Sequence, residues 1–164
     1  ARKLPLESNW AELRDQQRLV SKNVPNTGLA VTIDLGEWND IHPLNKKSVG
    51  DRLALLAEKI AYKQNVIADG PVYESMKIEG NKIILTFKKG TDNLQPTTDL
   101  KGFSIKGKSG KYEWAKAKIE GNKVVVWNNE IKEPIAVRYD WADNPDGNLK
   151  NKSGLPSSSF TTEN

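Results

Sequence analysis

The sequence of 164 residues contains no cysteine, which excludes disulfide bonds, a thiol nucleophile and zinc sites built on thiolates. No apolar run is long enough to cross a bilayer, and no signal peptide is visible. There is no glycine-rich phosphate loop, no HExxH motif and no cluster of metal-ligating residues. The sequence therefore predicts no cofactor, no bound metal and no membrane association. It contains a single histidine, His42.

The sequence also has only a small excess of positive charge. Lysine and arginine number 25 against 21 aspartates and glutamates, which gives a formal net charge of +4. The lysines are scattered among acids and form no basic stripe, so a nucleic-acid partner is not expected. Hydrophobic residues make up 37%, with five tryptophans, which is enough to form a core. The length fits one domain or one and a half.

The first part of the chain has helical periodicity around one short apolar run. A helix is predicted over residues 9–22, with Asn9 as its cap, and a strand over residues 29–33. A second helix is predicted from Ser48, which forms the capping pattern S-x-x-D with Asp51. One strand cannot form a sheet alone, since its backbone groups need partners. This part is therefore expected to dock onto something else.

After residue 64 the helical periodicity gives way to short runs in which apolar and polar residues alternate, separated by polar turns. Hairpins are predicted where residues 75–79 and 82–87 flank Gly80-Asn81, and where residues 116–120 and 123–127 flank Gly121-Asn122. Further strands are expected at the ranges 102–106 and 135–139, and the tail from 140 to 164 is expected to be irregular or a covering strap. We predict an antiparallel sandwich or open barrel for this part. The resulting division is 1–66 and 67–164.

His42 lies in the loop between the predicted strand and the second helix, where α/β enzymes often keep a general base. A base needs a group that stabilises the charged ring, and Asp40 is the nearest carboxylate, with Asp34 and Glu37 in the same loop. The competing interpretation is a surface histidine beside Pro43, which shapes the turn.

No serine in the sequence has the setting of a nucleophile. Ser104 lies within a predicted strand and is one residue off the nucleophile-elbow pattern. The serines at 157–159 lie in the tail and are expected to be solvated or packed. Catalysis by this chain alone is therefore not expected.

The tryptophans offer a different hypothesis. Trp114, Trp127 and Trp141 fall in the β region, where they either stack on sugar rings or form core. Trp38, four residues before His42, is the better candidate for a substrate-facing aromatic side chain.

Several motifs in order resemble the sialate O-acetylesterase family of SGNH-type carbohydrate esterases, and the resemblance covers nearly the whole chain. The motifs are Thr32-Ile-Asp-Leu-Gly-Glu37, Asp40-Ile-His-Pro43, Asn45-Lys46, Val49-Gly-Asp-Arg-Leu-Ala-Leu55, Gly70-Pro-Val-Tyr73, Glu79-Gly-Asn-Lys82, Gly102-Phe, Ala136-Val-Arg-Tyr139, Trp141-Ala and Gly154-Leu-Pro156. The resemblance implies the last strand and helices of a flavodoxin-like α/β/α core, followed by a β-sandwich-like region. It also implies removal of acetyl groups from sialic acids or plant polysaccharides through a serine acyl-enzyme.

By this resemblance His42 is the catalytic base, while the family's serine and oxyanion-hole residues are absent from these residues. The wider pattern places an acid three residues before the histidine, where this sequence has Asn39. Asp40, another loop carboxylate or a serine–histidine dyad would then take its place.

The sequence therefore predicts the C-terminal chain of a carbohydrate O-acetylesterase with a split active site. The serine would lie on a second polypeptide, and the substrate would be an acetylated sugar. The chain opens on Ala-Arg-Lys-Leu-Pro without a methionine, so it is expected to come from a longer protein. The family suggests a periplasmic or secreted location. The alternative is a non-catalytic sugar-binding or structural β-module.

Overall fold

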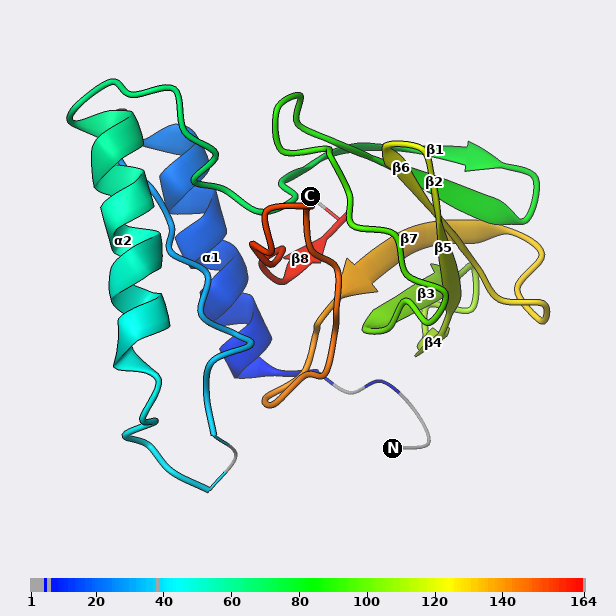
Figure 1. Cartoon of the computed structure of the whole chain (residues 1–164). Coiled ribbons are helices and arrows are strands. Elements are labelled where there is room, and N and C mark those ends of the chain that lie inside the picture. Colours follow the sequence, from blue (N-terminus) through cyan, green and yellow to red (C-terminus); the bar gives the residue numbers. More distant parts are fainter. Residues whose placement is uncertain (1–4, 6, 38, 164) are drawn as a thin grey trace.

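The structure is a computed structural model that describes residue 5 and residues 7–37 and 39–163. Two helices, α1 (Asn9–Asn23) and α2 (Lys46–Ile60), lie on one side of the molecule, and the strands lie on the other (Figure 1). The strands are β1 (Tyr73–Glu79), β2 (Lys82–Phe87), β3 (Phe103–Gly107), β4 (Tyr112–Trp114), β5 (Lys116–Glu120), β6 (Lys123–Trp127), β7 (Pro134–Tyr139) and β8 (Phe160–Thr161). No described helix is long and apolar enough to cross a membrane.

The strands form two antiparallel sheets of four, in the orders β1-β2-β6-β5 and β4-β3-β7-β8. Both predicted hairpins are confirmed, with Glu79 paired to Lys82 and Glu120 paired to Lys123. The glycine of each turn, Gly80 and Gly121, has a φ of 60°, a conformation that favours glycine. The expected antiparallel β region is therefore present.

One apolar core lies between the two sheets. Alternate residues turn inward, so Ile83 and Leu85 of β2 belong to the same core cluster as Phe103 and Ile105 of β3, and all four are almost fully buried. Burying a side chain of this size contributes about 1.5–3 kcal/mol. These contacts make the β region the most firmly packed part of the chain.

Both helices begin at caps other than those predicted. Ser8 rather than Asn9 caps α1, because its hydroxyl accepts the N–H of Ala11 at 3.1 Å. Asn45 rather than Ser48 caps α2, because the Asn45 side-chain oxygen accepts the N–H of Ser48 at 3.2 Å. In each case the side chain that satisfies a free N–H of the first turn fixes where the helix starts.

Residues 29–33, predicted to be a strand whose backbone groups need a partner, pair with no strand in the described chain. The segment runs beside the helices (Figure 1) and away from both sheets, so it has no neighbouring strand among the described residues to complete a ladder. Its contacts are instead with α2, where Arg52 donates to the carbonyl of Val31 at 2.5 Å.

Residues 140–159, here called the strap, pass between the helices and the sheets, as the orange and red trace shows (Figure 1). The strap is mostly irregular but well buried at Leu149 and Leu155. Arg14 of α1 donates to the Ser159 hydroxyl at 3.0 Å and to the Ala142 carbonyl at 2.5 Å. The expected covering strap is therefore present, and it joins α1 to the β region.

Candidate active-site loop

The loop at residues 34–45, here called the His42 loop, is anchored where it begins. The Asp34 carboxylate accepts two bonds from the Arg52 guanidinium, at 2.6 and 2.9 Å, and one from Lys150 at 2.9 Å. Burial raises the pKa of Asp34, but the bonds and charges of the two cations outweigh it and lower the pKa to about 2. Asp34 therefore stays ionised and ties the loop to α2 and to the strap.

Backbone bonds shape the rest of the loop. Asp40 Oδ1 accepts the backbone N–H of His42 at 2.7 Å, and Glu37 Oε1 accepts the backbone N–H of Leu44 at 3.1 Å. Asn45 ends the loop as the cap of α2. Carboxylates that bind backbone N–H groups in this way hold a turn. All three carboxylates of the His42 loop are thus engaged away from the imidazole.

His42 itself is exposed. Within the part of the chain that the structure describes, its ring makes no hydrogen bond. The ring is therefore accessible to solvent. Trp38, the predicted substrate-facing aromatic residue, lies outside the described residues.

The serines considered as nucleophiles are held in the β region. Ser104 is buried in β3. Ser157 and Ser159 are also buried, and their hydroxyls donate to the carbonyls of Pro71 at 2.7 Å and of Asp140 at 2.9 Å. Ser157 and Ser159 brace the strap, Ser104 is packed within its sheet, and none of the three belongs to the His42 loop.

The tryptophans of the β region do not form one row. Trp114 is in β4 and Trp127 in β6, which belong to different sheets, and Trp141 lies in the strap. Among the described residues, no group of three or more His, Cys, Asp or Glu side chains could hold a metal ion.

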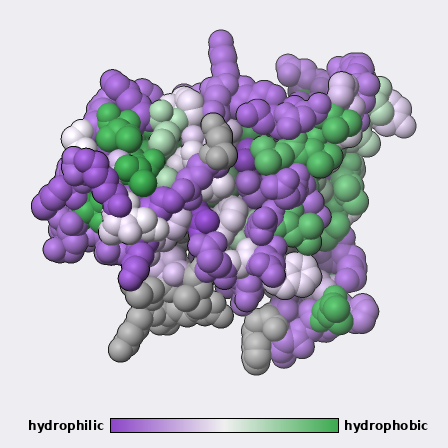
Figure 2. All heavy atoms as spheres, turned by 180° about the vertical axis from the view of Figure 1, so that it is seen from behind, coloured by the Kyte–Doolittle hydropathy of each residue, from purple (hydrophilic) through white to green (hydrophobic). Residues whose placement is uncertain are grey.

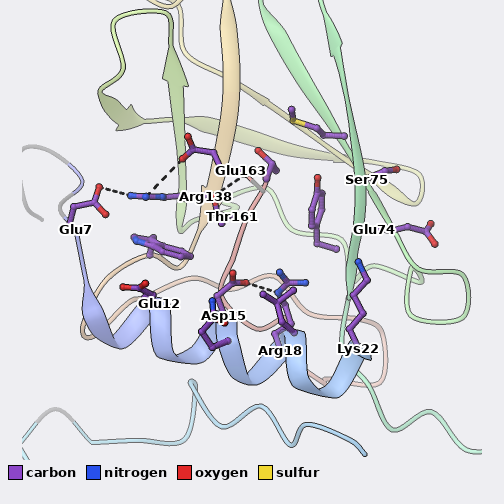
Figure 3. A pocket seen from close by; sticks show the side chains of 16 residues that line it. Glu7, Glu12, Asp15, Arg18, Lys22, Glu74, Ser75, Arg138, Thr161 and Glu163 are labelled. Atoms are coloured by element: carbon purple, nitrogen blue, oxygen red, sulfur yellow. Dashed lines mark hydrogen bonds and ion pairs between the residues drawn. The ribbon is translucent and has the colours of Figure 1, made fainter. Parts of the chain in front are cut away.

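A cavity of about 680 Å³, here called the α1 groove, lies between α1 and the strands (Figure 3). Its walls combine carboxylates, cations and two aromatic rings from residues as far apart as Glu7 and Glu163. Sequence reasoning missed it because the residues that line it come from both ends of the chain. Of the residues that line the groove, the sequence analysis had considered Trp141 as a possible sugar-stacking ring.

Asp140 is a buried titratable group that the sequence analysis did not single out. It is 2% exposed at the start of the strap, and its Oδ1 atom has no hydrogen-bond partner among the described residues. Burial raises its pKa to about 7, against the opposing effects of the Gly147 backbone N–H and the Arg14 guanidinium. Asp140 is thus a buried acid at the junction between α1 and the sheets.

Comparison with known proteins gives relatives of one kind. No family model matches the chain. Mouse sialate O-acetylesterase is 27% identical over 149 residues, which cover 85% of this chain and 28% of that protein. The human sialate O-acetylesterase is 32% identical over 81 residues, which cover 46% of this chain and 16% of that protein.

A solved structure agrees with these relatives. The crystal structure of a carbohydrate acetylesterase from Xanthomonas citri matches with a TM-score of 0.89 and 40% identity, over 95% of this chain and 36% of that one. The chain therefore spans only about a third or less of the length of the proteins it matches. These matches identify the chain as a sialate O-acetylesterase-like region that corresponds to the C-terminal part of such enzymes, as its motifs predicted.

Proposed function

We propose that this chain is the histidine-bearing region of a carbohydrate O-acetylesterase, of the sialate O-acetylesterase or acetylxylan-esterase type. His42 is the general base, and the serine nucleophile lies on a separate polypeptide that carries the rest of an SGNH core. The observation that carries the proposal is the His42 loop. The loop presents an exposed imidazole, and Asp34 fixes the start of the loop to α2 and to the strap. The esterase relatives support the reaction class.

In this mechanism His42 accepts the serine hydroxyl proton as the serine oxygen attacks the acetyl carbonyl. The imidazolium then gives that proton to the departing sugar oxygen, and the acetyl group stays on the serine. His42 next takes a proton from water as the water oxygen attacks the acetyl-enzyme. The imidazolium then returns that proton to the serine oxygen as acetate leaves, which restores the serine hydroxyl. The ring must therefore reach a serine hydroxyl at about 2.6–3.2 Å, and an exposed ring on a fixed loop can do so.

The acid that usually orients such a histidine is not supplied by the His42 loop in this proposal. Asp34 is bound to Arg52 and Lys150, and Glu37 and Asp40 bind backbone N–H groups. These bonds favour a serine–histidine dyad. Asp40 then acts by shaping the turn that carries His42.

Docking onto the rest of a flavodoxin-like core is supported by the surface of the first part of the chain. Most of the exposed large apolar side chains among the described residues lie between residues 10 and 62, including Leu13, Val20 and Leu53. Figure 2 shows apolar surface over the helical side of the molecule, on the right in that view. Contiguous apolar surface of this kind marks an interaction site. Residues 29–33 would then become the last strand of the partner's sheet, in a periplasmic or secreted enzyme.

Native and denaturing mass spectrometry of the protein purified from its source, with an aryl-acetate hydrolysis assay, tests the split site. We expect a second polypeptide that carries the serine, with activity lost when the two separate. A folded, inactive species of 18.3 kDa alone would instead support the β-module alternative.

Substitutions in the active assembly test the residue roles. His42→Ala should lower kcat by roughly 10⁴-fold or more with the fold intact by circular dichroism. Lys47→Ala, at an exposed position of α2, is the control and should leave kcat unchanged. Asp40→Asn should cost less than about tenfold, and a loss as large as that of His42→Ala would refute the dyad.

A further inference from the structure

The α1 groove has the size and the polarity of a small-ligand site. Its volume of about 680 Å³ falls within the range of roughly 300–1,000 Å³ that such sites occupy. Side chains of α1, among them Glu12, Asp15 and Arg18, face those of Arg138 and Glu163 across it (Figure 3).

Its aromatic rings are held in place before any ligand arrives. The Arg138 guanidinium lies 4.6 Å from the Trp141 ring centre and 4.2 Å from that of Tyr112, so it is stacked against both. Tyr73, on the β1 side, stacks on Phe160 with ring centres 4.8 Å apart and planes 6° apart. Rings fixed in this way bind a ligand without losing further freedom.

Its polar groups are also fixed, in part by burial. Asp15 and Arg18 form an ion pair of 2.7 Å and are only 5% and 9% exposed. Arg138 is paired with Glu7 at 2.8 Å. A desolvated, paired set of charges offers directed donors and acceptors to a ligand that is itself rich in both.

We propose that the α1 groove binds a neutral carbohydrate chain. Sugars combine an apolar C–H face, which packs on aromatic rings, with neighbouring hydroxyls that bond to planar carboxylate and guanidinium groups. Five carboxylates line the groove against three cations, so an acidic sugar is disfavoured there. The groove would hold the polysaccharide rather than react with it.

This inference goes beyond the proposed esterase role and does not depend on it. The groove is lined by α1 residues such as Asp15 and Arg18, while His42 lines no part of it. Loss of sugar binding and loss of hydrolysis are therefore separable.

Titration of the ¹⁵N-labelled chain with xylohexaose, mannohexaose and cellohexaose, followed by NMR, tests the proposal. We expect at least one of these neutral probes to shift the Trp141 indole signal and the α1 amides, with saturation below 10 mM. Trp114→Phe and Trp141→Phe identify the two indole signals, and the Trp114 signal should stay in place. N-Acetylneuraminic acid should bind at least tenfold more weakly.

Variants then locate the site. Glu12→Lys, at an exposed position of α1, should weaken binding at least fivefold while the spectrum stays folded. Trp141→Ala should weaken it at least tenfold, and Glu58→Gln on α2 is the control without effect. His42→Ala should bind the probe normally. The proposal is overturned if none of the neutral probes binds, if the acidic sugar binds better, or if Glu12→Lys binds as the unchanged chain does.

Discussion

We expect Asp140 to make the stability of this protein fall as pH rises. The carboxyl is buried, and its pKa is raised from 3.8 to about 7, first of all by loss of hydration. Between these two values the folded chain keeps a proton that the unfolded chain releases. The free energy of unfolding therefore decreases with pH across this range.

The magnitude follows from the two pKa values. Their difference corresponds to about 4 kcal/mol in full, of which about 2.5 kcal/mol falls between pH 5 and pH 8. The groups that face Asp140 are Arg14 of α1, Tyr139 of β7 and Asp146 of the strap. Arg14 opposes the rise in pKa and Asp146 adds to it.

Urea unfolding at about pH 5, 6, 7 and 8 measures the effect. We expect the free energy of unfolding to drop by about 2.5 kcal/mol for the unchanged chain and to stay nearly level for Asp140→Asn, which cannot ionise. Asp146→Asn, at an exposed position of the same strap, should keep most of the slope. The reasoning fails if Asp140→Asn keeps the full pH slope, or if the unchanged chain becomes more stable from pH 5 to pH 8.

Three further predictions concern the packing and the His42 loop. Gly70→Ala should cost about 2–4 kcal/mol in urea unfolding, because its Cβ would lie 2.0 Å from the Pro156 carbonyl oxygen, whereas Gly50→Ala meets nothing within 4 Å and should cost nothing. Phe160→Ala should cost about 3–5 kcal/mol, since the ring is fully buried, and a loss below about 1 kcal/mol would contradict the packing. Asp34→Asn should lower the free energy of unfolding by about 1 kcal/mol at neutral pH, after allowance for solvent screening. This loss should vanish as the pH falls towards about 2, because the native carboxylate becomes protonated there. A loss that persists at that pH would show that the charge is not the cause.

The β region could be predicted well because its signals are local. Each Gly-Asn turn fixes its own hairpin, and the alternation beside it decides which face is buried. β8 was missed because Phe160–Thr161 is only two residues long and becomes a strand solely through pairing with Arg138 and Tyr139 of β7. No pattern within two residues can show that.

The predicted strand at residues 29–33 shows the opposite limit. An apolar run shows that a segment can form a strand, but its backbone hydrogen bonds need a neighbouring strand. The described chain supplies no such strand beside residues 29–33. The same limit applies to the His42 loop. The sequence placed Asp34 and Asp40 near His42, but it could not show that Lys150, 116 positions away, would bind Asp34.

That ion pair gives the β region a part in the proposed reaction, although it supplies no catalytic group. The strap carries Lys150, which binds Asp34 at the start of the His42 loop. Ser159 and Ala142 of the strap also accept hydrogen bonds from Arg14 of α1. A displacement of the strap would therefore move both the loop and the helix beside it. In the proposed reaction the general base must lie within about 0.5 Å of its productive position, so the bond from Lys150 to Asp34 would help to hold the His42 loop in place. A substitution in the strap that leaves the fold intact would then lower kcat while the chemistry of the imidazole itself is unchanged.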